Sequence, residues 1–160
     1  MSRIITKLLL LMAFVFSFNV TYAKDKDEPQ LQYSIKSCGS GQQGYWVVEV
    51  TAYVAKKGDI NNTILQKCAV HGALFKGVAP GQGGSPQKPL CASASAEVQN
   101  ADFFNAFFQQ DFKNYADVIA GTLSTMKVGK GYEITATVQI AKDNLRKAME
   151  QAGIIRKLGF

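Results

Sequence analysis

The residues best suited to chemistry are a cysteine and a histidine three positions apart. In a helix, Cys68 and His71 would lie on roughly one face. This spacing suits two metal ligands, or a thiolate beside its general base. His71 is the only histidine in the chain, so any cysteine–histidine or serine–histidine nucleophilic site has to use it. The interpretation that we favour is structural, with Cys68 packed in the core and His71 flanking the helix end.

Two further cysteines, Cys38 and Cys91, complete a set of three. A structural zinc site needs four ligands, and these two would have to converge on Cys68 and His71 to supply them. In an exported protein a disulfide between any two of the three would leave one over, and the sequence does not select a pair. Three reduced thiols are an equal alternative. We therefore expect no cofactor and no metal, with a site at Cys68 and His71 as the alternative.

A cluster of phenylalanines is the second candidate site. Phe103, Phe104, Phe107 and Phe108 lie in a segment, 102–120, that is typical of a helix broken near Asp111. Core packing is the commoner role of such a cluster. Two adjacent pairs cannot all point inward, however, so at least one ring should be partly exposed or covered by a partner. An exposed aromatic edge is typical of a protein-binding site, and these four residues are the predicted one.

Other patterns argue against enzymes and nucleic-acid-binding proteins. No paired carboxylates stand out, because helix caps and turns account for most acidic residues. The glycines at 81–84 lack the lysine and hydroxyl residue that would follow in a phosphate loop. The basic residues are scattered, whereas nucleic-acid-binding proteins concentrate them on one face. We therefore expect a protein that is not an enzyme and does not bind nucleic acid.

The first 23 residues have the pattern of a signal peptide. Arg3 and Lys7 precede an apolar run at 8–18. Thr21 and Ala23 are small residues at the two positions that a signal peptidase reads before a cleavage site after Ala23. The run is shorter than the about 20 residues that a spanning helix needs. Cleavage after Ala23 would lower the formal charge from +6 to +4. The product would have no transmembrane segment and would be exported to the periplasm, the outer membrane or the cell surface.

The rest of the chain predicts one α+β domain at 31–160, after a flexible tail at 24–30. The whole chain, with 160 residues of which 47% are hydrophobic, is too short for two ordinary domains and too apolar for a disordered protein. Alternating apolar residues predict a hairpin of strands 31–35 and 45–55, and a second hairpin of 122–128 and 132–140. Such alternation favours an antiparallel or mixed sheet with one buried face, which about three helices cover.

Helical spacing predicts the covering elements. A first helix begins at an Asp59 cap and ends near Gly77, and the last runs over 142–158. The segment 77–89 holds four glycines and three prolines, so it is predicted to be a mobile surface loop or one that orders on binding. A short strand is expected within 90–98.

Two segments carry a family resemblance. Residues 70–77 (VHGALFKG) and the ending at 142–160 resemble uncharacterised small secreted proteins of Bacteroidetes-type bacteria. The strand-then-helix ending is also remotely similar to small envelope lipoprotein and flagellar-assembly domains. The resemblance implies an envelope location and a non-enzymatic role in an assembly, although the acylated cysteine of the lipoproteins is missing.

The function that we expect is therefore binding. The chain would be an exported accessory protein of a cell-envelope or surface assembly, with protein partners in the envelope. A small exported enzyme or metal-binding protein that uses Cys68 and His71 is the alternative.

Overall fold

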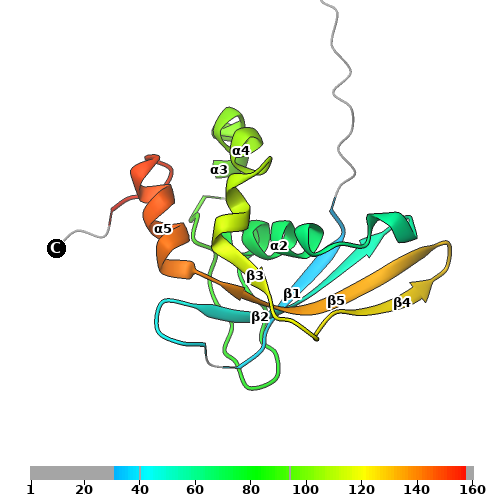
Figure 1. Cartoon of the computed structure of the whole chain (residues 1–160). Coiled ribbons are helices and arrows are strands. Elements are labelled where there is room, and N and C mark those ends of the chain that lie inside the picture. The colour runs from blue at the N-terminus through cyan, green and yellow to red at the C-terminus, as the bar shows by residue number, and fades with distance from the viewer. Residues whose placement is uncertain (1–30, 40, 94, 158–160) are drawn as a thin grey trace, which may run out of the picture. The chain divides into compact units, whose positions relative to one another are not determined.

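The structure, a computed structural model, describes residues 31–39, 41–93 and 95–157. An antiparallel sheet carries helices on one face, which confirms the expected α+β fold (Figure 1). Its strands, all antiparallel to their neighbours, are β1 (Tyr33–Ser37), β2 (Trp46–Val54), β3 (Ala116–Val118), β4 (Ser124–Val128) and β5 (Gly131–Ile140). The signal peptide predicted at 1–23 and the tail predicted at 24–30 lie outside the described residues.

Both expected hairpins are present, and their buried faces follow the alternation. Val48, Val50, Ala52 and Val54 of β2 are at most 5% exposed, as are Ile134, Ala136, Val138 and Ile140 of β5. The β4–β5 turn places Gly129 at φ +58°, while Lys130 keeps a negative φ. A two-residue turn with glycine in its first central position is a type II′ turn, whose twist suits a hairpin.

One edge of the sheet is made by two short strands in succession. β3 pairs with Val138–Ile140 and β4 pairs with Gly131–Thr135, so both lie along the same side of β5. The residues at 119–123 interrupt this edge between them. We expected 116–118 to end a helix, but these residues form β3, because a 3-10 turn (Asp111–Tyr115) returns the chain to the sheet.

The helix that packs on the sheet is α2 (Asn62–His71), which continues as a π-helical turn over Gly72–Lys76. Its cap is Asn61, whose Oδ1 accepts a hydrogen bond from the Ile64 N–H at 3.0 Å. The expectation that Asp59 caps this helix is therefore wrong, because Asp59 belongs to a preceding 3-10 turn at Lys57–Asp59. The helical segment ends where expected, at Gly77, whose φ of +76° favours glycine.

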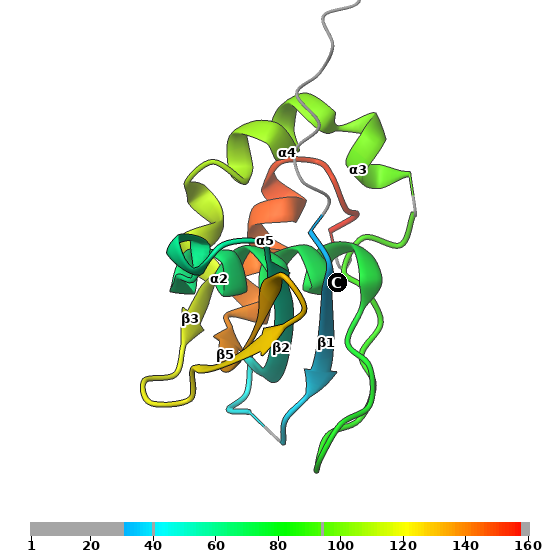
Figure 2. The ribbon, with the colours of Figure 1, turned by 90° about the vertical axis from the view of Figure 1, so that its right-hand side faces the viewer.

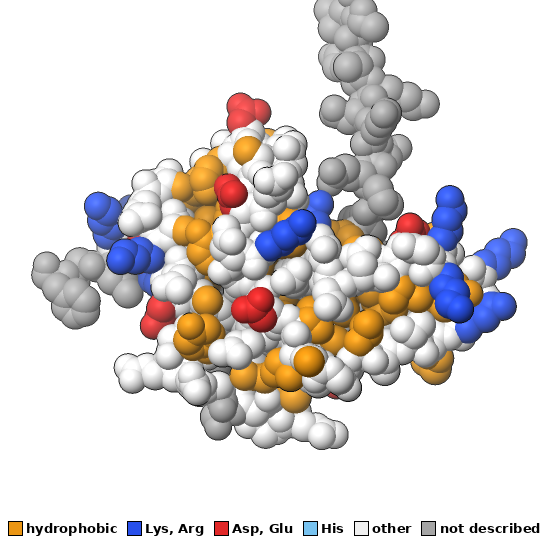
Figure 3. Space-filling model, viewed as in Figure 1, with side chains coloured by type: hydrophobic (Ala, Val, Ile, Leu, Met, Phe, Trp, Pro, Cys, Tyr) orange, Lys and Arg blue, Asp and Glu red, His pale blue; other side chains and the backbone are white. Residues whose placement is uncertain are grey.

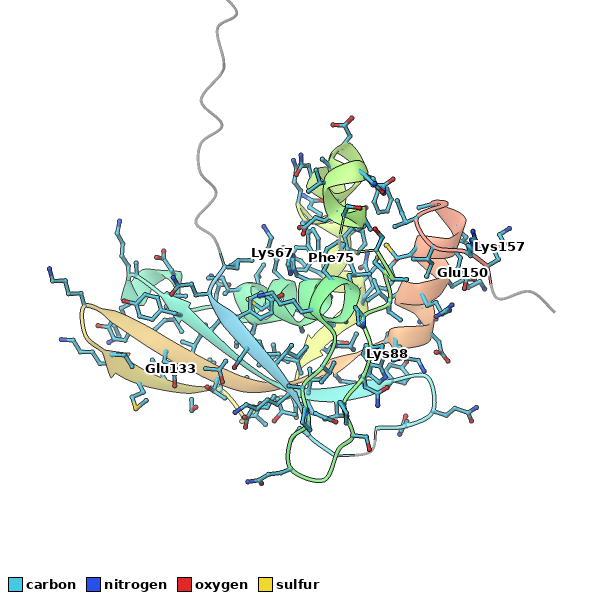
Figure 4. The ribbon with its side chains drawn as sticks, turned by 180° about the vertical axis from the view of Figure 1, so that it is seen from behind. Lys67, Phe75, Lys88, Glu133, Glu150 and Lys157 are labelled. Atoms are coloured by element: carbon cyan, nitrogen blue, oxygen red, sulfur yellow. The ribbon has the colours of Figure 1, made fainter. Side chains whose placement is uncertain are left out.

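The remaining helices are shorter than predicted. The segment expected to hold a strand instead leads into α3 (Ala96–Gln99), and α4 (Ala101–Phe107) follows it directly. The C-terminal helix α5 (Lys142–Gln151) places Leu145 and Met149 in the core. Arg146 forms an ion pair at 3.0 Å with Glu150, which Figure 4 labels on this helix. It ends before the predicted residue 158, because turns occupy 152–155.

The Gly- and Pro-rich segment 77–89 is attached to the sheet. Val78 and Gln87 exchange two backbone hydrogen bonds of 2.8 and 2.9 Å, which makes a small hairpin. The backbone of Ala79 accepts from the Ser37 N–H at 2.8 Å and donates to the Ile35 carbonyl at 3.1 Å. The segment therefore runs beside β1 and covers its outer edge, as Figure 2 shows, rather than being a free surface loop.

Candidate functional site

His71, the residue singled out in the sequence, is the centre of a hydrogen-bonded chain. Its Nδ1 lies 2.5 Å from the Tyr33 hydroxyl, and its Nε2 lies 3.0 Å from Oε1 of Glu97. The three residues come from β1, the end of α2 and α3, so the contacts join elements far apart in the sequence. In the tautomer with the ring proton on Nε2, the imidazole donates to Glu97 and Nδ1 accepts from the Tyr33 hydroxyl.

The surroundings of this hydrogen-bonded chain favour the neutral forms of His71 and Tyr33. Burial is the largest cause that lowers the pKa of His71 from its ordinary value of 6.5, and the positive charges of Lys76 and Lys67 act in the same direction. The charge and hydrogen bond of Glu97 oppose them. Burial likewise raises the pKa of Tyr33. At neutral pH the tyrosine and the imidazole of this hydrogen-bonded chain are therefore both neutral.

Two of the three cysteines are buried, and their thiols are held in the protonated form. Cys68 is fully buried, and that burial raises its pKa to about 12, while burial raises the pKa of Cys91 to about 11. All three cysteines, including the half-buried Cys38, are free. Among the described residues, no group of three or more His, Cys, Asp or Glu side chains is placed to hold a metal ion. The chemistry considered for Cys68 and His71 is therefore not supported by their geometry.

The phenylalanine cluster divides into core and boundary residues. Phe104 and Phe107 are 2% and 4% exposed, so they belong to the core. Their inclusion in the predicted binding site is therefore corrected. Phe104 packs edge-on against Phe75 with ring centroids 4.9 Å apart, and Phe107 lies 5.7 Å from Tyr115.

Phe103 and Phe108 remain half-buried, as the adjacent pairs require. Phe108 lies 5.7 Å from the His71 ring, and Nζ of Lys67 is 5.9 Å from the Phe108 centroid. Figure 4 shows Lys67 and Phe75 above the covered face of the sheet. The cluster therefore attaches α4 to α2, and its side chains are mostly committed within the fold.

A different surface gathers most of the large apolar side chains that are exposed among the described residues. All five residues of β4 are exposed, and no described residue pairs with the edge of β4 that faces away from β5. The segment 119–128 exposes four large apolar side chains at 40–59%, namely Ile119, Leu123, Met126 and Val128. Met126 and Tyr53 lie on the same face of the sheet, because each is the register partner of Glu133 in β5. In Figure 3 apolar side chains form a band across this part of the molecule.

Basic side chains gather at the end of the same surface. Lys127 lies in β4 and Lys130 in the adjoining turn, while Lys56 and Lys57 lie two and three residues after the end of β2. Val54, which ends β2, and Lys127 both oppose Tyr132 of β5, so the four lysines share one end of the sheet (Figure 3). All four are exposed, and none forms an ion pair with a described residue.

Comparison with known proteins adds no assignment. The chain matches no family model, and no curated protein or solved structure is significantly similar to it. Within the ranges that the structure describes, no helix has the length and apolar content needed to cross a membrane. The resemblance to small secreted and envelope proteins therefore stays a prediction.

Sequence reasoning found His71 but missed Tyr33, Glu97 and the edge of β4. Tyr33 and Glu97 are separated by 64 positions, and no spacing rule links them. The edge left a weak signal that could have been used. The run at 123–128 combines apolar residues with a single charge, which is unusual for an unprotected edge strand.

Proposed function

We propose that this protein is an exported, non-catalytic binding protein of the cell envelope or surface. It binds an extended, acidic segment of a protein partner, which adds to the sheet beside β4. The unpaired edge of β4 is the observation that carries this proposal. An edge strand presents backbone donors and acceptors to any extended chain, and strand addition is a recurrent mode of peptide recognition.

The hairpin geometry identifies which backbone groups would bind. The residues that flank a two-residue turn, Val128 and Gly131, exchange hydrogen bonds in such a hairpin. Alternation then directs the backbone groups of Thr125 and Lys127 away from β5. These two residues therefore offer up to four hydrogen bonds to an added strand.

The two edges of the sheet are treated differently. The outer edge of β1 is covered by the segment at 77–89, through the bonds between Ala79 and its neighbours in β1. Natural proteins protect edges with charge, proline, bulges or a covering segment. β4 has one lysine and an exposed Met126 and Val128, so it is the weakly protected edge.

Charge selects the partner. Lys56, Lys57, Lys127 and Lys130 place four positive charges beside the edge, which attracts an acidic segment and accelerates its association. A second copy of this chain, added parallel to β4, would bring two such groups together, and like-charge repulsion disfavours that arrangement. An acidic partner is the occupant that we propose, because it complements the four lysines whichever way it runs.

The non-catalytic role is supported by the state of the reactive side chains. Both nitrogens of His71 are engaged within the fold, and the raised pKa of Cys68 keeps its thiol protonated. Export is supported by the apolar run and the small residues that precede position 24.

The test uses a synthetic peptide of alternating valine and glutamate, with a valine–lysine peptide as the charge control. Isothermal titration should show binding of the acidic peptide only, and the affinity should fall as salt rises. Thr125→Pro removes an outward N–H while leaving the bonds to β5, so it should abolish binding, and Thr125→Ala should retain it. Equal binding of both peptides, or no effect of Thr125→Pro, would contradict the proposal.

A further inference from the structure

A cavity of about 300 Å³ lies at the other end of the sheet, between the β1–β2 connection and the Gly-rich hairpin at 78–87. Figure 4 shows this hairpin below the sheet, beside the ends of β1 and β2. The cavity is separate from the β4 edge, since its strands are β1 and β2. Its volume lies at the lower end of the range for small-molecule sites.

The lining is neutral and rich in groups that can bond a ligand. Trp46 and Tyr45 contribute aromatic surface, and Ser37, Ser85 and Gln87 contribute hydroxyl and amide groups. None of the lining residues carries a charge. This composition argues against phosphates, carboxylates and amines as ligands, because a charged ligand would lose its hydration without gaining a counter-charge.

Two polar groups of the lining have no partner inside the fold. Ser37 is only 8% exposed, yet its hydroxyl makes no hydrogen bond with a described residue. The indole N–H of Trp46, which is half-buried, likewise bonds no described residue. No buried side-chain nitrogen or oxygen of the described residues lacks a partner, so these two groups keep access to solvent and are able to bond ligand or water atoms.

Glycines let the hairpin pack closely against Ser37 at this position. A Cβ atom added to Gly84 would lie 1.8 Å from Oγ of Ser37, and one added to Gly81 would lie 2.0 Å from the Ser37 carbonyl oxygen. Only residues without a side chain allow the hairpin to approach β1 this closely. The hairpin therefore stands over Ser37 as one wall of the cavity.

From these observations we propose that the cavity binds a neutral sugar ring. The apolar face of a pyranose packs on an aromatic side chain, and its hydroxyls both donate to and accept from serine, amide and indole groups. A neutral lining that combines Trp46, Tyr45 and an unpartnered Ser37 hydroxyl offers both kinds of contact. This site goes beyond the proposed function. Sugar binding at this end of the sheet and strand addition at β4 are independent of each other.

Trp46 is the only tryptophan of the chain, so its fluorescence reports on the cavity directly. The purified protein is titrated with D-glucose, D-galactose, D-mannose and N-acetyl-D-glucosamine, and with D-glucuronate as a charged control. We expect at least one neutral sugar to give a saturable change with a Kd on the order of 1 mM, and glucuronate to bind at least tenfold more weakly.

Ser37→Ala separates binding from folding. The variant should weaken sugar binding by up to about tenfold, because it removes one hydrogen bond. It should leave the unfolding midpoint unchanged or higher, because the hydroxyl that it removes has no partner in the fold. Gln82→Ala, in the same hairpin but outside the cavity lining, is the matched control and should bind as the wild type does.

Three results would overturn the proposal. One is the absence of saturable binding by all four neutral sugars up to about 50 mM, well above the expected Kd. Another is an affinity that Ser37→Ala leaves unchanged. The third is tighter binding of a neutral peptide, N-acetyl-triglycine amide, which would assign the cavity to polypeptide instead.

Discussion

His71 should make the stability of this protein depend on pH in a direction opposite to that of an ion-paired histidine. Its pKa in the folded state lies below its ordinary value of 6.5, chiefly because the ring is buried. The unfolded chain therefore binds a proton at a higher pH than the folded chain does. The contribution of His71 is fully present above the unfolded pKa and is lost as pH falls towards the folded pKa.

The magnitude follows from linkage. Between the two pKa values the unfolded state carries up to one more proton, so the free energy of unfolding falls by up to about 1.4 kcal/mol for each pH unit. His71 is the only histidine, so no other imidazole contributes to this slope. Its side chain is 20% exposed, so solvent does not remove the effect of burial.

The assay is urea unfolding of the wild type and of His71→Gln at pH 7.5, 6.5, 5.5 and 5.0. The difference between the two proteins isolates the histidine from the carboxylates, which titrate in both. We expect the wild type to lose stability relative to His71→Gln as the pH falls below about 6.5. Tyr33→Phe, which keeps the imidazole, should retain the pH dependence while lowering stability by about 1 kcal/mol.

Glu97 provides a second control, since it is the group that raises the pKa of His71. Glu97→Gln should lower the His71 pKa further, which NMR of the imidazole C–H signals measures. A wild type that gains stability relative to His71→Gln as the pH falls, or an imidazole pKa above 6.5, would refute the reasoning. Either result would mean that the pairing with Glu97 outweighs burial.

The remaining predictions concern packing and backbone geometry. Phe107→Ala should cost about 3–5 kcal/mol in urea unfolding, and Phe103→Ala clearly less, because only Phe107 lies in the core; equal costs would contradict this division. Asn61→Ala should lower the free energy of unfolding by about 1 kcal/mol in the same measurement, whereas Asp59→Ala should change it little. The reverse order would mean that Asp59 is the cap of α2. Gly81→Ala should accelerate hydrogen exchange at the Ala79 amide, since the added Cβ forces the hairpin away from β1; unchanged exchange would show that the hairpin adapts.

Much of the fold could be predicted because period-two alternation is a local signal. Val48 to Val54 and Ile134 to Ile140 alternate cleanly, and both became buried faces of central strands. β3 could not be found in this way, because three residues do not establish a period. Its position depends on pairing with Val138–Ile140, which is a tertiary contact.

The sites were harder to predict, since they depend on contacts between distant residues. Sequence spacing drew attention to Cys68 beside His71, but His71 instead contacts Tyr33 and Glu97, which come from other elements. Glycine content predicted a loop at 77–89 without indicating that its backbone would pair with β1. The four phenylalanines could be recognised as too many for one inward face, and the structure accordingly leaves Phe103 and Phe108 half-buried.

Hydrogen exchange at the β4 amides tests the central proposal most directly. With the acidic valine–glutamate peptide bound, the Thr125 and Lys127 amides should exchange at least tenfold more slowly, because an added strand accepts their hydrogen bonds. The amides of Met126 and Val128, which already bond to β5, should change much less. Unchanged exchange at Thr125 and Lys127 at saturating peptide, or protection confined to other elements, would contradict binding at this edge.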